Sequence, residues 1–332
     1  MAAAIEGLET EEKKDGYLQL HKSKGQHLLT NQRILDKIVK KSAIKPTDTV
    51  LEIGPGTGNL TLNLVEAAQS VFVVELDKRM VEVLQKRVEE SGVQDRLTVI
   101  NKDALKAEFP PFDLVVANIP YGISSPLVAK LVYGARLFRS TTLLLQREFA
   151  RRLLAKPCDS EFNRLAVNVN LVADVEFVMD VSKKEFVPCP EVDSSVVIIR
   201  PKAEVPNINL DEWWAFIKAC FCKKNRTLGA TFKQKKKVME LLGMFNLAGS
   251  NGEGKDYISS SDNDDDEGKS DEEEFSPSSC SEIGASSFKE KLIGVLKSGN
   301  FEDKRPSKLS NEELLHLLAM FNQKGIYFHD HS

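Results

Sequence analysis

Short apolar runs alternate with amphipathic stretches through the first half of the chain. The apolar runs are rich in valine, isoleucine and leucine, and they lie at residues 49–53, 71–75, 97–100, 112–117 and 141–145. Between them, apolar positions recur with helical spacing near residues 59–68, 78–90 and 126–133. Strands of this composition that alternate with helices are typical of βαβ units with a buried parallel sheet. The pattern therefore predicts an α/β fold.

The second half changes character. Two further β-like runs, at 167–181 and 194–200, predict an antiparallel hairpin at the end of the sheet. After Pro201 the strand pattern stops, and residues 211–222 and 309–321 show helical spacing instead. Ser310 is a predicted N-cap, with Glu313 three residues later as in a capping box. The sequence thus predicts a small C-terminal helical domain.

Composition divides the chain further. Residues 248–287 are mostly Gly, Ser, Asp and Glu, too polar to offset their chain entropy, so we predict a disordered insertion there. Within it, residues 256–274 hold ten acids against one lysine, a charge of −9. Since the whole chain carries −4, the remainder carries +5. We expect a flexible segment at 1–20, one domain at 21–203 and the helical domain, with its insertion, at 204–332.

A basic stretch in the helical domain contrasts with the acidic insertion. Residues 218–237 contain eight lysines and arginines and no acid, with Phe221 and Phe232 among them. Such a stretch is either a solvated helix face or a surface for RNA phosphates, and the interleaved aromatics favour RNA. The residues that we expect to bind RNA are Lys223, Lys224, Arg226, Lys233, Lys235, Lys236 and Lys237.

Cysteine usage and the N-terminus bear on the compartment. The five cysteines form no disulfide framework, as expected where thiols stay reduced. We predict that Cys220 and Cys222 are small core residues rather than zinc ligands, and we expect no metal. Residues 1–16 have five acids and no apolar core, which fits neither a secretory signal nor an organellar transit peptide. No run approaches the roughly 20 apolar residues of a membrane span.

The most informative segment is LEIGPGTGN at 51–59, which follows an apolar strand and opens a helix. Gly54, Gly56 and Gly58 lie where the backbone turns tightly and a ligand approaches. Glu75 ends the second strand, where a carboxylate can accept both hydrogens of a ribose diol, and Asp103 follows the third, where it can accept from an adenine amine. These residues predict an adenosine-containing cofactor, and the compressed glycine spacing favours S-adenosylmethionine over a dinucleotide. A plain βα turn and a Rossmann oxidoreductase are the alternatives.

The fourth strand ends in Asn-Ile-Pro-Tyr at 118–121. An adenine amine is a poor nucleophile because its lone pair is delocalised into the ring. Acceptors aimed at its two hydrogens, from the Asn118 side chain and a nearby backbone carbonyl, would favour the form with a localised lone pair. Pro120 stiffens the loop, and Tyr121 offers a face on which a flipped base can stack.

These segments resemble the ribosomal RNA adenine dimethyltransferases. The resemblance covers nearly the whole chain outside the acidic insertion, and the segments that carry it are KGQHLL (24–29), LEIGPGTGNLT (51–61), ANIPYGISSP (117–126), QREF (146–149), FVPCPEVDSS (186–195) and KKNRTL (223–228). It implies a Rossmann-like class I S-adenosylmethionine methyltransferase sheet. Cys189 and Glu191 depart from the family, in which proline and lysine are common at these positions.

The resemblance also implies roles for single residues. His27 and Leu29 would line the methionine end of the cofactor, with Gly54 beneath it. The diol acceptor falls on Glu75, the adenine acceptor on Asp103 and the target-amine acceptor on Asn118. Tyr121 and Phe186 would sandwich the target base, so the expected catalytic set is Asn118, Pro120, Tyr121 and Phe186. A catalytic base or a plain structural histidine are alternatives for His27.

The expected activity is dimethylation of N(6) in two adjacent adenines near the 3′ end of small-subunit rRNA, during ribosome biogenesis. The expected partners are that rRNA and the pre-ribosomal particle, with no membrane and a monomeric enzyme. The alternatives are an assembly factor whose RNA binding rather than methylation is essential, and an adenine methyltransferase for another RNA. We expect a nuclear, nucleolar location, or a mitochondrial one if the true N-terminus carries a transit segment absent here.

Overall fold

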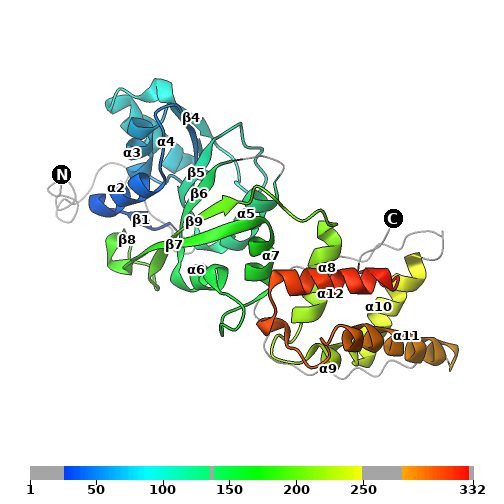
Figure 1. Cartoon of the computed structure of the whole chain (residues 1–332). Helices are drawn as coiled ribbons and strands as arrows, with labels where there is room; N and C mark the ends of the chain where they lie inside the picture. Colours follow the sequence, from blue (N-terminus) through cyan, green and yellow to red (C-terminus); the bar gives the residue numbers. More distant parts are fainter. Residues whose placement is uncertain (1–25, 135–137, 249–278, 329–332) are drawn as a thin grey trace. The chain divides into compact units, whose positions relative to one another are not determined.

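The computed structural model describes residues 26–134, 138–248 and 279–328, and the side chains of 244–248 and 279–283 are excluded. The chain divides into two compact units (Figure 1). The first comprises residues 1–150 and 173–201, and the second comprises residues 151–172 and 202–332. Residues 151–172, which lie inside the predicted domain 21–203, belong to the second unit.

A seven-stranded sheet forms the first unit, in the order β4-β3-β2-β5-β6-β9-β7 (Figure 1). The strands are β2 (Thr49–Ile53), β3 (Ser70–Val74), β4 (Leu97–Ile100), β5 (Leu114–Asn118), β6 (Ser140–Gln146), β7 (Ala173–Val181) and β9 (Ser194–Pro201). The first five pair in parallel, whereas β9 pairs antiparallel with both β6 and β7. The predicted α/β fold and the antiparallel pair at its end are confirmed.

Helices between the strands complete this unit. They are α2 (Gln32–Lys41), α3 (Asn59–Ala67), α4 (Lys78–Glu90), α5 (Ser124–Tyr133) and α6 (Arg147–Leu154), the last of which crosses into the second unit. The three predicted helices are confirmed to within two residues, and α2 and α6 were not predicted. A separate two-stranded sheet joins β1 (Leu28–Leu29) to β8 (Phe186–Val187). Short 3-10 turns lie at Gln94–Arg96, Tyr121–Ile123, Lys183–Glu185 and Pro306–Lys308.

The topology decides where chemistry can occur. In β2, β3, β4 and β5 the chain runs in one direction, so all four strands end at the same edge of the sheet. The residues that follow them, 54–58, 75–77, 101–103 and 118–121, therefore gather at that edge. Ligands of open α/β sheets bind at this edge.

The second unit is helical, with a core of aromatic rings. Its helices are α7 (Arg164–Val172), α8 (Leu210–Phe221), α9 (Leu228–Phe232), α10 (Lys235–Ala248), α11 (Ser279–Ser298) and α12 (Asn311–Gln323). Phe216 and Phe328 meet edge to face with centroids 5.0 Å apart, and Phe321 lies 5.4 Å from Phe328. The predicted helices over 211–222 and 309–321 are confirmed, as is the capping box of Ser310 and Glu313.

Three predictions here were wrong in part. Residues 167–172 belong to helix α7 rather than to a strand, because α7 is buried on nearly all sides and so lacks the polar stripe that marks a helix in sequence. Residues 279–287 of the predicted insertion lie in α11, whose apolar side begins at Phe288 and continues through Leu292 and Leu296. Cys220 is buried as predicted, but Cys222 is exposed. Residues 249–278 and the N-terminal segment 1–20 lie outside the described residues.

Candidate active site

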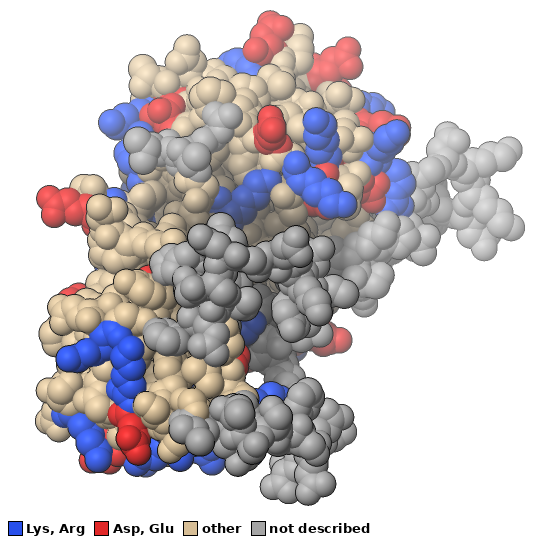
Figure 2. All heavy atoms as spheres, turned by 90° about the vertical axis from the view of Figure 1, so that its right-hand side faces the viewer, with Lys and Arg blue, Asp and Glu red and all other residues tan. Residues whose placement is uncertain are grey.

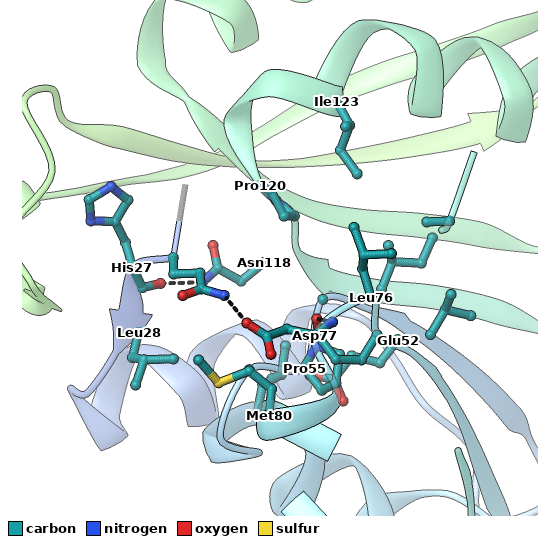
Figure 3. Close-up of a pocket in the computed structure, with 18 of the residues that line it drawn as sticks. His27, Leu28, Glu52, Pro55, Leu76, Asp77, Met80, Asn118, Pro120 and Ile123 are labelled. Carbon is teal, nitrogen blue, oxygen red and sulfur yellow. Dashed lines mark hydrogen bonds between the residues drawn. The ribbon is translucent and has the colours of Figure 1, made fainter. Parts of the chain in front are cut away.

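A cavity of about 450 Å³ opens at the carboxyl edge of the parallel strands (Figure 3). This volume falls within the range of pockets that hold cofactors. Among its lining residues are eight predicted site residues: His27, Leu29, Gly54, Gly56, Glu75, Asp103, Asn118 and Pro120. Gly58, Tyr121 and Phe186 are not among them.

The glycine loop after β2 forms the floor of the cavity. Gly54 and Gly56 have φ values of +69° and +56°, which favour glycine. A Cβ on Gly56 would lie 2.7 Å from Cδ2 of Leu28, and one on Gly54 would lie 3.1 Å from Cδ of Pro120. The two glycines thus let the loop, the N-terminal segment and the Asn118 loop approach one another closely. Gly58 serves packing instead, since its Cβ would lie 2.5 Å from Cδ1 of Leu84 in helix α4.

Two carboxylates follow neighbouring strands into the cavity. Glu75 comes directly after β3, and its Oε1 accepts a 2.8 Å hydrogen bond from the backbone N–H of Asp77. Burial raises the pKa of Glu75 above its ordinary value. Asp103 lies beyond β4, where its Oδ1 accepts a 2.9 Å hydrogen bond from the N–H of Leu105. In both cases the local bond fixes one side of the carboxylate and leaves acceptor capacity for a ligand.

The segment from Gln26 to Leu29 crosses the cavity and is held at several points. The side chain of Gln26 donates a 3.0 Å hydrogen bond to the Asp77 carboxylate. Leu29 pairs with Phe186 across the two-stranded sheet, and its carbonyl accepts a 2.9 Å bond from the Asn59 side chain. This segment therefore forms one wall of the cavity.

Asn118 is oriented by that wall. Its Nδ2 donates a 3.2 Å hydrogen bond to the backbone carbonyl of His27 (Figure 3). Because the amide nitrogen is used in this way, Oδ1 remains an acceptor for another group. The His27 ring takes a different partner: its Nδ1 lies 2.7 Å from the carbonyl of Pro188. The structure thus gives His27 a main-chain contact with Asn118, and its ring a contact outside the cavity.

The two predicted stacking residues lie differently. Tyr121 is partly buried, its hydroxyl lies 2.7 Å from Oγ of Ser194, and its ring is stacked on His27 with centroids 6.1 Å apart. Burial raises the pKa of Tyr121, so its phenol stays neutral. Phe186 is only 2% exposed and belongs to the same apolar cluster as Leu29. It therefore offers no open face in this conformation.

Glu52 is a cavity residue that sequence reasoning missed. It lies within strand β2, lines the cavity and is 1% exposed. Its Oε2 has no hydrogen-bond partner among the described residues. Burial, reinforced by the negative charge of Glu75, raises the pKa of Glu52 to about 8. A single acid inside an apolar strand at the glycine motif was the available sequence signal.

The shifted pKa of Glu52 predicts a pH dependence of stability. With a folded-state pKa of about 8 against an ordinary 4.5, the folded protein holds this proton more tightly than the unfolded chain does. Its contribution is therefore most favourable below pH 4.5 and is lost as the pH rises toward 8. Against Glu52→Gln, which does not titrate, we expect the unfolding free energy of the cofactor-free protein to fall by up to about 1.4 kcal/mol per pH unit in this window. Urea unfolding at several pH values measures this difference, and a constant difference would contradict it.

The predicted RNA-binding side chains lie on the second unit and differ in exposure and in ion pairing. Lys223, Arg226, Lys233, Lys235 and Lys236 are exposed, whereas Lys224 and Lys237 are partly buried. Lys233 forms an ion pair with Glu302, and Lys237 forms one with Glu240, each at 2.7 Å. Lysine and arginine side chains lie among acidic ones on the face drawn in Figure 2.

The two interleaved aromatic residues give no support to that prediction. Phe221 is 7% exposed and Phe232 is fully buried, so both belong to the helical core rather than to an RNA-binding surface. Their spacing among the lysines follows from the amphipathic helices α8 and α9. Sequence alone could not show which acids elsewhere in the chain pair with the lysines.

The sheet order, the glycine loop and the acidic residues at successive strand ends define a class I methyltransferase fold, as predicted. The chain belongs to the ribosomal RNA adenine dimethylase family, whose sequence model matches residues 17–251. It is therefore a member of a family of methyltransferase enzymes, and the predicted resemblance is confirmed.

Individual relatives agree with this assignment. The chain is 64% identical over 324 residues to "Ribosomal RNA small subunit methyltransferase, mitochondrial" of Arabidopsis thaliana, covering 96% of this chain and 84% of the relative. It is 46% identical over 339 residues to "Ribosomal RNA small subunit methyltransferase" of the same plant, covering 94% and 93%. The crystal structure of a dimethyladenosine transferase from Plasmodium falciparum matches with a TM-score of 0.75 and 37% identity, covering 91% of this chain and 100% of the other. No helix among the described residues is long and apolar enough to cross a membrane.

Proposed function

We propose that the chain transfers methyl groups from S-adenosylmethionine to N(6) of two adjacent adenines near the 3′ end of small-subunit rRNA, within a pre-ribosomal particle. Relatives with 64% and 46% identity are named as small-subunit rRNA methyltransferases, which supports this substrate. The observation that carries the proposal is the orientation of Asn118, whose amide nitrogen is bonded to the His27 carbonyl.

The cavity fits S-adenosylmethionine in the chemistry of its lining. Glu75 would accept from the ribose diol and Asp103 from the adenine amine, while Gly54 and Gly56 leave the space that a Cβ would fill. Glu52, with its unpartnered buried oxygen, would take the ammonium of the methionine end. His27 and Leu29 would complete the wall at that end. When bound, the cofactor supplies a methyl group on a positively charged sulfur.

The chain's contribution to the reaction is alignment and hydrogen bonding. Oδ1 of Asn118 would accept from one hydrogen of the target amine, and the backbone carbonyl near Ile119 would accept from the other. Both contacts favour the form of the amine with a localised lone pair, and they strengthen as positive charge develops on its nitrogen. Pro120 stiffens the loop that holds these acceptors, so little reorganisation is needed during transfer.

Tyr121 would support the flipped base by stacking. Its ring already stacks on His27, beside the backbone that orients Asn118, so a base on it would lie near the acceptors. The proposed second platform, Phe186, is buried in the structure described here. Its role in the sandwich therefore requires that the segment around it shifts when RNA binds.

The test uses the purified full chain, labelled S-adenosylmethionine and small subunits that lack the modification. After incubation, the RNA is digested to nucleosides and the labelled nucleoside is identified. We expect N(6),N(6)-dimethyladenosine from small subunits and no label from large subunits. Label in any other nucleoside, or only in large-subunit RNA, would overturn the proposal.

The same assay distinguishes the compartment. We propose a mitochondrial location over the nucleolar one, because the relative with 64% identity is named as mitochondrial. Unmodified small subunits from mitochondria and from the cytosol are incubated with the enzyme in parallel reactions. We expect faster transfer to the mitochondrial particle, and faster transfer to the cytosolic one would restore the nucleolar alternative.

Exposure and ion pairing predict which of the proposed RNA-binding residues contribute most to RNA affinity. Lys223 and Arg226 are exposed, and no ion pair is described for either, so both remain available for phosphates. We expect Lys223→Ala with Arg226→Ala to reduce the slope of log affinity against log salt by about 1.4 to 1.8. The matched pair Lys233→Ala with Lys237→Ala removes lysines that already hold Glu302 and Glu240, and a smaller change is expected. Filter binding of the rRNA over a salt series measures both, and equal slopes for the two double variants would contradict the ranking.

A further inference from the structure

Lys130 lies on α5, the helix that follows the Asn118 loop, and its side chain reaches the loop after β4. Its Nζ donates to the backbone carbonyls of Ala104, Leu105 and Ala107 over 2.8, 3.0 and 2.6 Å. The Phe109 ring covers the ammonium with its centroid 4.4 Å away. Three carbonyls and one aromatic face therefore surround a single charged group.

This arrangement matches the chemistry of an ammonium. A lysine has three N–H donors and no acceptor, and here each donor has its own carbonyl. An aromatic face adds a cation–π contact on the remaining side. Burial lowers the pKa of Lys130, while the charges of Asp103 and Glu108 act against that shift. The partly buried ammonium thus has a protein acceptor for each of its N–H groups.

The three carbonyls belong to the turn that carries the proposed adenine acceptor. The carbonyl of Asp103 accepts from the N–H groups of Lys106 and Ala107 over 3.0 and 2.8 Å. Its side chain accepts from the N–H of Leu105 over 2.9 Å. These bonds close the turn on its inner side, and Lys130 binds the carbonyls that the turn directs outward. Lys130 therefore ties the position of Asp103 to the helix that follows the catalytic loop.

We propose that Lys130 is a positioning residue for cofactor recognition: it holds the 103–107 turn so that the Asp103 carboxylate meets the adenine amine of the cofactor. This inference rests on the proposed function, in which Asp103 is the adenine acceptor. Lys130 does not line the cavity and acts only through the turn. Ala104 and Leu105 of the same turn also line the cavity, but only Asp103 offers a carboxylate, so the largest effect should fall on the adenine amine.

The test compares two ligands that differ at one group. S-adenosylhomocysteine carries the adenine amine, and its 6-deamino analogue has hydrogen in that place. Calorimetry measures their affinities for the full-length wild type, for Lys130→Met and for the matched control Lys106→Met. Lys106 is an exposed lysine on the same turn, and methionine keeps an unbranched chain one heavy atom shorter while removing the charge of either side chain.

For the wild type we expect at least tenfold tighter binding of S-adenosylhomocysteine than of the analogue. Lys130→Met should weaken S-adenosylhomocysteine about tenfold and leave the analogue within twofold, so that the preference is lost. Lys106→Met should behave as the wild type does. Unchanged binding of the analogue also shows that Lys130→Met is folded.

Three results would overturn the inference or its basis. If Lys130→Met keeps the wild-type preference, or weakens both ligands equally, Lys130 does not position Asp103. If the wild type binds both ligands equally well, the proposed role of Asp103 as adenine acceptor fails too. The wild-type measurement therefore distinguishes a failure of the proposed function from a failure of the inference about Lys130. Should Lys130→Met not fold, Lys130→Arg decides: a planar guanidinium cannot direct three N–H groups from one nitrogen, so the preference should fall at least threefold, and a wild-type preference would refute the inference.

Discussion

Replacing Asn118 by alanine is expected to lower the rate constant of methyl transfer about 10²- to 10³-fold, the loss typical of one aimed hydrogen-bonding group in a transition state. The reason is geometric. The bond from its Nδ2 to the His27 carbonyl orients the amide, and alanine removes both that bond and the acceptor opposite it. Single-turnover transfer at saturating cofactor and saturating RNA measures the effect without a contribution from binding.

A matched amide elsewhere provides the control. The side chain of Asn63 on helix α3 donates a 3.4 Å hydrogen bond to Asp36, and Asn63 does not line the cavity. Asn63→Ala should therefore leave the transfer rate unchanged. The proposed role of Asn118 would be refuted if the transfer rate of Asn118→Ala stayed within threefold of the wild type, or if the loss of rate disappeared at saturating RNA.

Replacing Gly58 by alanine is expected to lower the unfolding free energy of the protein by about 2–4 kcal/mol. Two costs combine at this position. Its φ of +89° disfavours an L side chain, and the new Cβ would lie 2.5 Å from Cδ1 of Leu84, which is fully buried in helix α4. Because Leu84 is fully buried, a shift of its side chain would disturb the surrounding core, and part of the strain would fall on the glycine loop and on the start of α3. Urea unfolding gives the free energy.

A second variant, Gly92→Ala, distinguishes the cost of the backbone conformation from the cost of the steric contact. It also has a positive φ, +68°, but a Cβ there would meet nothing within 4 Å. Gly92→Ala should therefore cost only about 1 kcal/mol, the backbone share alone. Equal losses for the two variants would show that the contact with Leu84 contributes nothing.

Much of the cofactor cavity follows from sequence because parallel strands end at one edge. Gly54, Glu75 and Asp103 each follow a predicted strand. Since these strands are parallel, the three residues must lie together at the carboxyl edge of the sheet. Asn118 followed by the same argument from β5. Nothing beyond strand order and direction was needed for these four.

Residues whose roles depend on partners far along the chain could not be predicted in this way. Glu52 is an inward residue of a strand, and its missing partner is visible only once the cavity is formed. The three carbonyls around Lys130 lie 23 to 26 residues earlier, in an irregular turn without a sequence signature. Lys233 is similar: its partner Glu302 is 69 residues away.

The burial of individual aromatic residues was also not predicted. Phe221 and Phe232 are spaced among lysines as on an RNA-binding surface, yet both point into the core of the helical unit. Amphipathic helices place lysines and aromatics close in sequence on opposite faces, and the sequence alone does not say which face a ligand meets. The wrongly assigned strand at 167–172 has the same origin, since uniform burial removes periodicity.

The positions of the modified adenines along the rRNA provide the decisive test of the proposed methyl transfer. An adenine with two methyl groups on N(6) has no N–H left to pair with a complementary base, so reverse transcription stops there. After incubation of unmodified small subunits with S-adenosylmethionine and the enzyme, we expect stops at two adjacent adenines near the 3′ end of the RNA, and none with Asn118→Ala. Stops at other positions, or stops that persist with Asn118→Ala, would contradict this expectation.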